Sequence, residues 1–158
     1  MKRGPVLLLP AMALALGCRS SDVSRAARSP AFLSSPEGAA LALPFSEAVR
    51  AGDFLMLSGQ VGNVPGKREL VPGGIGAEAA QALDNVKAIL ERHGASMDDV
   101  VKCTVFLADI REWPAFNEVY RRYFPRHFPA RSALAASGLA LGARVEVECT
   151  AYTPSTRP

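Results

Sequence analysis

The chain has 158 residues, of which 49% are hydrophobic and 21% charged, a balance typical of one folded domain with a real core. The net charge of +3 falls to +1 without residues 1–17, because Lys2 and Arg3 go and 16 basic side chains remain against 15 acidic ones. Such a small charge argues against a nucleic-acid-binding surface.

The first 36 residues do not have the pattern of a folded domain. Residues 1–17 combine a basic start with an apolar run that is too short to cross a bilayer, as in a secretory signal peptide. Gly17 before Cys18 is typical of a bacterial lipoprotein cleavage site, which predicts that Cys18 becomes the lipidated first residue. Segment 18–36, rich in Ser, Arg and Pro, then predicts a flexible tether to a domain over 37–158. We expect an exported protein held at a membrane by its lipid alone, in the periplasm or at the cell surface; plain secretion is the alternative.

Within the domain, strand-like and helix-like segments follow one another in the order β-β-α-β-α-β-β. Strands are predicted over 42–49, 53–62, 99–109 and two parts of 128–152, and helices over 77–94 and 111–124. The last two strands, joined by a Gly-containing loop, form a β-hairpin in this prediction. Arg131 begins the first strand of that hairpin, and Glu146 lies inside the second.

With more strands than helices, the order predicts an α+β domain with both helices on one face of a mixed sheet. In the last strand, apolar and polar residues alternate: Val145, Val147, Cys149 and Ala151 against Glu146, Glu148, Thr150 and Tyr152. One face of the strand is therefore expected to pack on the helices. The other face is acidic and is left polar or covered by another chain.

Cysteine and histidine usage gives no sign of a metal site. Cys103 and Cys149 lie inside apolar strands; they can pair in an oxidising compartment, but the frequent burial of cysteine as a small hydrophobe favours two free thiols. No spacing is typical of zinc binding, and His93 and His127 are expected to be structural.

The order of the elements and seven short segments together resemble the RidA (YjgF) family of imine deaminases. The segments are LPFSEAV (43–49), LMLSGQV (55–61), LDNVKAIL (83–90), DVVKCTVFLAD (99–109), FNEVYRRYF (116–124), FPARS (128–132) and VEVECTAY (145–152). The resemblance implies a chorismate-mutase-like fold and a homotrimer with clefts between neighbouring subunits. It also implies hydrolysis of 2-imino acids, or their enamine tautomers, to 2-keto acids and ammonia without a cofactor.

The resemblance assigns roles to single residues. Arg131 matches the arginine that binds the substrate carboxylate, a task that suits the planar guanidinium fork. Glu146 matches the glutamate that activates water, and one carboxylate can move the proton in both the attack and the departure of nitrogen. Asn117, Ser58 and Gly59 match positions that line the cleft.

Four positions depart from the pattern of the family. Ala133, expected to contribute backbone to the site, stands where many relatives carry cysteine. Phe45, also expected at the site, keeps the ring of the usual tyrosine and loses its hydroxyl, at a cost of about 0.5–1.5 kcal/mol. Glu47 adds a negative charge that is expected to repel an anionic substrate, and Glu78 replaces a common glutamine without an evident consequence.

Two other functions compete with the leading prediction of a 2-iminobutanoate/2-iminopropanoate deaminase-like hydrolase. A non-catalytic scaffold that binds keto or amino acids suits an exported protein, because the pyridoxal-phosphate enzymes that release imines are mainly cytoplasmic. The presence of both Arg131 and Glu146 favours the enzyme. An endoribonuclease activity is disfavoured by the small net charge, and no nucleic-acid partner is expected.

Overall fold

The computed structural model describes residues 29–154. The predicted signal peptide, Cys18 and most of the predicted tether lie outside the described residues. Within residues 29–154, no helix is long and apolar enough to cross a membrane.

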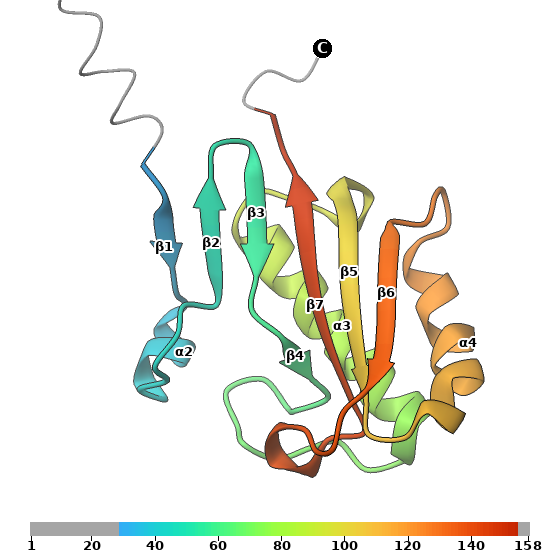
Figure 1. Cartoon of the computed structure of the whole chain (residues 1–158). Coiled ribbons are helices and arrows are strands. Elements are labelled where there is room, and N and C mark those ends of the chain that lie inside the picture. The colour runs from blue at the N-terminus through green and yellow to red at the C-terminus, as the bar shows by residue number, and fades with distance from the viewer. Residues whose placement is uncertain (1–28, 155–158) are drawn as a thin grey trace, which may run out of the picture.

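A single sheet organises the domain (Figure 1). Its strands are β1 (Ala31–Leu33), β2 (Ala48–Ala51), β3 (Phe54–Leu57), β4 (Gln60–Val61), β5 (Val100–Leu107), β6 (Ala130–Ala135) and β7 (Val145–Tyr152). They lie in the order β1-β2-β3-β7-β5-β6, and β4 pairs with β7 beyond the end of β3. Only β5 and β6 are parallel, so the sheet is mixed, as predicted.

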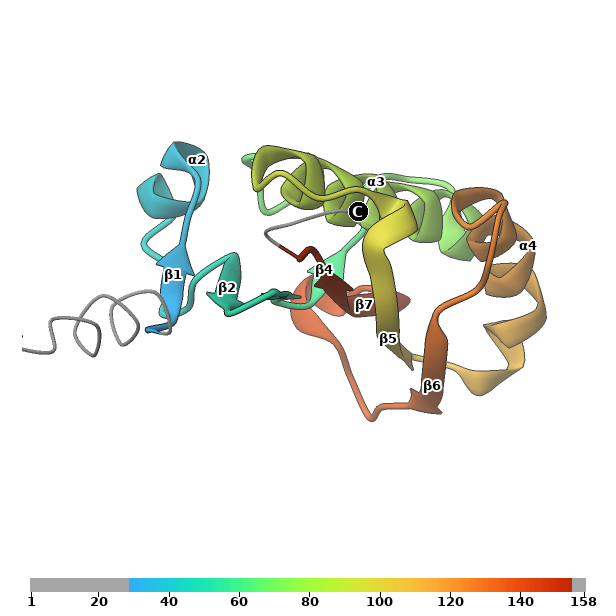
Figure 2. The same cartoon turned by 90° about the horizontal axis from the view of Figure 1, so that it is seen from above.

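Within residues 29–154, three α-helices accompany the sheet, namely α2 (Pro36–Ala40), α3 (Gly74–Arg92) and α4 (Trp113–Tyr123). The two long helices, α3 and α4, cover the same face of the sheet (Figure 2). The buried side of α3 carries Ala79, Ala82, Leu83, Val86, Ile89 and Leu90. Gly94, with φ of +75°, follows the last turn of α3, where a left-handed residue ends a helix. The predicted α+β class with two helices on one face is confirmed.

The N-terminal part of the domain differs from the prediction in two ways. Residues 31–33, assigned to the tether, form strand β1 and pair with β2, so the fold begins before residue 37. Residues 42–47, expected to be strand, are not: β2 starts only at Ala48, after the short helix α2 capped by Ser35. Because α2 ends at Ala40, residues 42–47 form the connection from α2 to β2.

The predicted C-terminal hairpin is wrong. Strands β6 and β7 do not pair with each other, because β5 lies between them. Cys103 of β5 has Arg131 as its partner on one side and Cys149 on the other. Two consecutive strands separated by a loop do not have to be neighbours, since the intervening position can be taken by an earlier strand.

The same register corrects the expectation of free thiols. Cys103 and Cys149 are directly opposed in the antiparallel pair β5–β7, with their Cα atoms 4.1 Å apart, and form a disulfide. Both side chains are buried under the helices, with Cys103 fully inaccessible. The bond joins two neighbouring interior strands of the sheet, β5 and β7.

The face of the sheet without long helices, called the open face below, carries large apolar residues. Exposed members are Phe54, Met56, Leu134 and Tyr152, and the Phe54 and Tyr152 rings lie 5.2 Å apart. Glu146 and Glu148 of β7 lie on this face too, since they alternate with buried valines and Cys149. A surface of this kind is typical of a contact between protein chains.

Candidate active site

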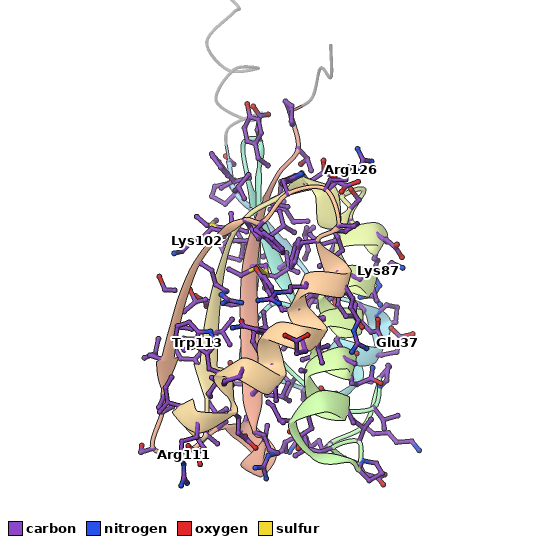
Figure 3. All side chains as sticks on the ribbon, turned by 90° about the vertical axis from the view of Figure 1, so that its right-hand side faces the viewer. Glu37, Lys87, Lys102, Arg111, Trp113 and Arg126 are labelled. Carbon is purple, nitrogen blue, oxygen red and sulfur yellow. A yellow bond between two sulfur atoms is a disulfide. The ribbon has the colours of Figure 1, made fainter. Side chains whose placement is uncertain are left out.

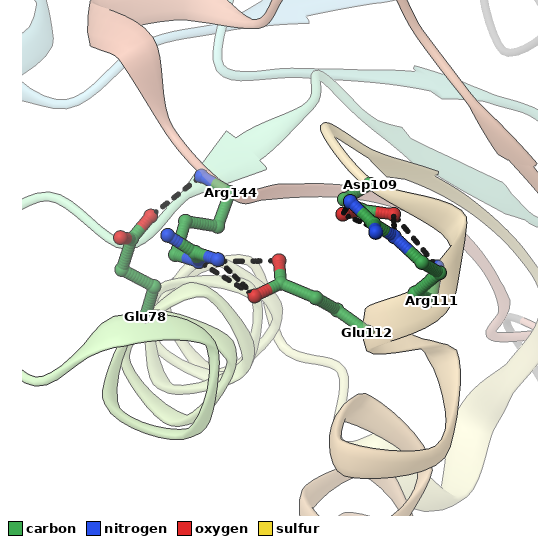
Figure 4. Close-up of polar contacts among 5 residues, drawn as sticks. All are labelled: Glu78, Asp109, Arg111, Glu112 and Arg144. Atoms are coloured by element: carbon green, nitrogen blue, oxygen red, sulfur yellow. Dashed lines mark hydrogen bonds and ion pairs between the residues drawn. The ribbon is translucent and has the colours of Figure 1, made fainter.

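Glu146 lies in β7, opposite Val61 of β4 on one side and Phe106 of β5 on the other. The chain just before it is held by both long helices (Figure 4). The backbone N–H of Arg144 donates to buried Glu78 at 2.8 Å, and the Arg144 guanidinium binds Glu112 at the start of α4. Glu78, whose role was not evident from the sequence, therefore helps to fix the start of β7 and with it Glu146.

The Glu146 carboxylate lies directly over Gly59. A Cβ atom built on Gly59 would be only 1.9 Å from Oε1 of Glu146, so a side chain at this position would displace the carboxylate. Desolvation, aided by the negative charge of Glu148, raises the pKa of Glu146 above its ordinary value. A raised pKa suits a carboxylate that must accept a proton and give it back near neutral pH.

Glu146 and Gly59 form part of the wall of a cavity of about 690 Å³. Phe45 lines the same cavity and is 56% exposed, so its ring is not used in the core. The cavity occurs where the sheet is interrupted, between β4 and the chain that leads from α2 to β2. It therefore receives walls from both sides of the sheet, including Ile89 and Arg92 of α3.

Ser58 is beside this cavity but has a local structural partner. Its hydroxyl donates to the carbonyl of Ser46 at 2.7 Å, and its N–H donates to the carbonyl of Glu47 at 3.0 Å. These bonds attach the segment that carries Phe45 to the end of β3. The structure thus brings Glu146, Gly59, Ser58 and Phe45 to one region.

Arg131 lies elsewhere, on edge strand β6. Because its partner in β5 is buried Cys103, its side chain belongs to the helix-covered face, and α4 packs over it. Its Nη2 donates to Oδ1 of Asn117 at 2.8 Å. Asn117, predicted to line the cleft, is therefore placed to orient the guanidinium. Figure 3 shows this side of the molecule, with α4 packed along the sheet edge and Trp113 labelled.

Three aromatic rings of α4 surround the Arg131 guanidinium. Its Cζ lies 4.6 Å from the ring centre of Tyr120, 5.6 Å from Trp113 and 5.7 Å from Phe116. Such contacts hold a planar cation in one orientation and leave its remaining N–H groups free to bind an anion. The sequence showed an aromatic side of this helix but gave no reason to link it to Arg131.

Tyr120 has a further property that the sequence did not reveal. It is only 3% exposed, and its hydroxyl has no hydrogen-bond partner among residues 29–154. Burial raises its pKa to about 12, against a smaller opposing effect of the Arg131 charge, so the phenol stays neutral beside the cation. Ala133 follows on the same face, half-buried against the core, and no reactive side chain replaces the cysteine of relatives.

A single chain does not bring Arg131 and Glu146 together. Arg131 lies on the helix-covered face at the sheet edge, whereas Glu146 lies on the open face two strands away. Each group has its own defined surroundings, Gly59 under the Glu146 carboxylate and Asn117 with the α4 rings around the Arg131 guanidinium; these two regions are called the half-sites below. They can meet on one substrate only if they come from different copies of the chain.

The expected repulsion by Glu47 is not supported. Its carboxylate accepts from Nη1 of Arg92 at 2.9 Å and contacts Nε2 of His93 at 2.8 Å, so the charge is compensated within the chain. Desolvation would raise the pKa of Glu47, but the hydrogen bonds from His93 and Arg92 outweigh it and hold the pKa below its usual value.

His93 is structural, as expected, and His127 is exposed in the loop before β6. Within residues 29–154, no three His, Cys, Asp or Glu side chains are grouped to hold a metal ion.

Known proteins share this architecture. The family model described as Endoribonuclease L-PSP matches residues 37–153. A protein of Capra hircus named 2-iminobutanoate/2-iminopropanoate deaminase is 46% identical over 108 residues, 68% of this chain and 79% of the relative. The chain is a member of the RidA (YjgF) family. The Homo sapiens protein of the same name is 44% identical over 68% of this chain and 79% of its own, and these names support a deaminase-like enzyme.

Solved structures of the family confirm the chorismate-mutase-like fold. The structure of RidA from Psychrobacter is 38% identical, with a TM-score of 0.66 over 70% of this chain and 89% of its own. A Mycobacterium tuberculosis member of the YjgF family is 29% identical, with a TM-score of 0.67 over 79% of this chain and all of its own length.

Proposed function

We propose that the protein hydrolyses 2-imino acids, or their enamine tautomers, to 2-keto acids and ammonia at sites shared between copies of the chain. The observation that carries the proposal is the paired design of the two half-sites. A cation is fixed by Asn117 and three rings, and a half-buried carboxylate is fixed over Gly59. The names of the family members support the same chemistry.

The chemistry follows from these groups. Arg131 binds the substrate carboxylate through its free N–H groups and holds the imine carbon within reach of water. Glu146 takes a proton from water as the oxygen adds to the C=N carbon and returns it to the imine nitrogen, which gives a carbinolamine with one hydroxyl and one amine. The same carboxylate then takes the hydroxyl proton and delivers it to the amine, the C–N bond breaks, and ammonia leaves as the C=O bond forms.

A homotrimer is the assembly that we propose, as the family resemblance implies. The open face supports it, because Phe54, Met56, Leu134 and Tyr152 expose apolar surface next to Glu146. Covering this face with neighbouring copies would bury that surface and place each Glu146 near another chain. Light scattering on the purified protein is expected to give three times the mass of one chain; a monomer mass would contradict the shared site.

We also propose that the protein is exported and anchored by a lipid on Cys18. The buried Cys103–Cys149 disulfide supports export, because such bonds persist in oxidising compartments and are rare in the cytosol. Replacing Cys18 by alanine is expected to move the protein from the membrane fraction to the soluble fraction. An unchanged membrane fraction would rule out the lipid anchor.

Mixing two inactive variants tests the shared site directly. Arg131→Ala and Glu146→Gln should each abolish most turnover of 2-iminopropanoate. In trimers assembled from equal amounts of both, about one quarter of the sites combine an intact Arg131 with an intact Glu146 from the neighbour, so activity should return to roughly that fraction. If the mixture stays as inactive as its parts, the two residues do not share a site. If the wild-type protein turns over no imine, the deaminase proposal fails and a binding scaffold remains.

A further inference from the structure

The cavity beside Glu146 is larger than small imino acids require. Its volume of about 690 Å³ lies in the range of sites that enclose whole drug-sized ligands, roughly 300–1,000 Å³. The side chains of 2-iminopropanoate and 2-iminobutanoate are a methyl and an ethyl group. Either would leave most of this space to water.

The walls of the cavity are largely apolar, and they come from distant parts of the chain. The large apolar lining residues are Leu41, Leu43, Phe45, Val61, Ile89 and Leu141. Phe45 and Leu141 are 56% and 50% exposed, so the fold itself does not cover them. Burial of such surface by a ligand is favourable in proportion to the apolar area removed from water.

Charged groups at the cavity are balanced or already paired. Three acidic residues, Glu37, Glu47 and Glu146, face three basic ones, Lys67, Arg68 and Arg92. Glu47 and Arg92, the least exposed pair, bind each other, and Glu47 also contacts His93. Apart from Glu146 itself, the lining residues among 29–154 therefore present no unpaired buried charge that would select an acidic or basic side chain.

We infer that this cavity receives the side chain of the substrate and that the protein prefers 2-imino acids with large, uncharged apolar side chains, branched aliphatic or aromatic. The inference rests on the proposed deaminase function, because it takes Glu146 as the group next to the reacting carbon. Gly59 and Phe45 then lie between the reacting carbon and the part of the cavity lined by Leu41, Leu43 and Leu141. Each additional methylene that enters such a pocket raises kcat/KM by about 4- to 10-fold, so several together give clear discrimination.

The test compares imines generated by an amino-acid oxidase from alanine, leucine and phenylalanine. For the wild-type protein, kcat/KM should be at least about 10-fold higher for the leucine and phenylalanine imines than for the alanine imine. Ala88→Phe fills the cavity from the exposed side of α3 and should reduce that ratio about 10-fold. Lys87→Phe, the exposed neighbour that does not line the cavity, is the matched control and should leave the ratio as it is.

Calorimetric binding of the product 2-keto acids separates failure of this inference from failure of the deaminase proposal. If no imine is turned over but 4-methyl-2-oxopentanoate and phenylpyruvate bind more tightly than pyruvate, and Ala88→Phe removes the difference, the cavity assignment stands and the deaminase proposal fails. If the alanine imine is turned over and larger imines gain nothing, the assignment is overturned and the deaminase proposal stands. An unchanged ratio in Ala88→Phe would also overturn the assignment.

Discussion

Removing the Cys103–Cys149 disulfide should lower the stability of the domain substantially. The bond closes a loop with a sequence separation of 46 residues. The loop-entropy relation, ΔS of about −2.1 − 1.5R ln n cal/mol/K, then gives about 4 kcal/mol at 25 °C for n of 46. For a domain of this size, a loss of that magnitude lowers Tm by on the order of 10–20 °C.

The measurement is chemical unfolding of the wild-type protein and of the double variant Cys103→Ala/Cys149→Ala, each with and without a reducing agent. The wild-type midpoint should fall on reduction toward that of the double variant, whose own midpoint should not respond. Because both sulfur atoms are buried between the sheet and the helices, reduction should require opening of the domain and should be slow in native buffer.

The outcome that refutes the reasoning is specific. Protein purified from an oxidising compartment should contain no reactive thiol at residues 103 and 149 after denaturation without a reductant. Two reactive thiols there, together with a wild-type midpoint that does not respond to reduction, would show that the opposed cysteines stay free. The support for export that the disulfide gives would then be lost as well.

Three further predictions concern the two half-sites. Glu146→Gln should lower kcat by about 10²–10⁴-fold. Because the pKa of Glu146 is raised in the folded state, ionisation of Glu146 destabilises the fold, and the variant should be more stable than the wild type at neutral pH. Urea unfolding should show this gain in stability vanishing as the pH falls below 4.5. Gly59→Ala should displace only the flexible end of Glu146, and kinetics beside a melting curve should show a large loss of kcat with little change in Tm. Asn117→Ala frees the Arg131 guanidinium from one bond of 2.8 Å, and steady-state kinetics should show mainly a higher KM, by about 10-fold; an equal fall in kcat at constant KM would speak against a role in carboxylate binding.

Hydrophobic periodicity in the sequence correctly predicted the elements that have one buried and one exposed side. Helix α3 and strand β7 carry patterns of 3.6 and 2 residues, and their buried sides are those that the patterns predict. The same reasoning failed for residues 42–47, where short apolar runs do not distinguish a strand from an extended crossing segment. It also failed for residues 31–33, because a three-residue edge strand is stabilised by its pairing with β2 rather than by its own sequence.

Strand order lies beyond what periodicity can give. Alternation tells which residues of a strand share a face, but the neighbour of that strand is decided by contacts far apart in sequence. The position of β5 between β6 and β7 decides two outcomes at once. It opposes Cys103 and Cys149, which makes the disulfide, and it places Arg131 beside Cys103 on the face that α4 covers.

That placement also explains why both charges are found where they are. The Arg131 guanidinium packs against the α4 rings, and because β6 is an edge strand its N–H groups lie at the side of the sheet. A carboxylate on the open face can rest on Gly59 beside a cavity without meeting that guanidinium in its own chain. Since the sheet keeps the two groups apart, neither neutralises the other within one chain. In the proposed trimer, a neighbouring copy that covers the apolar open face would join them, so assembly and chemistry would depend on the same surface.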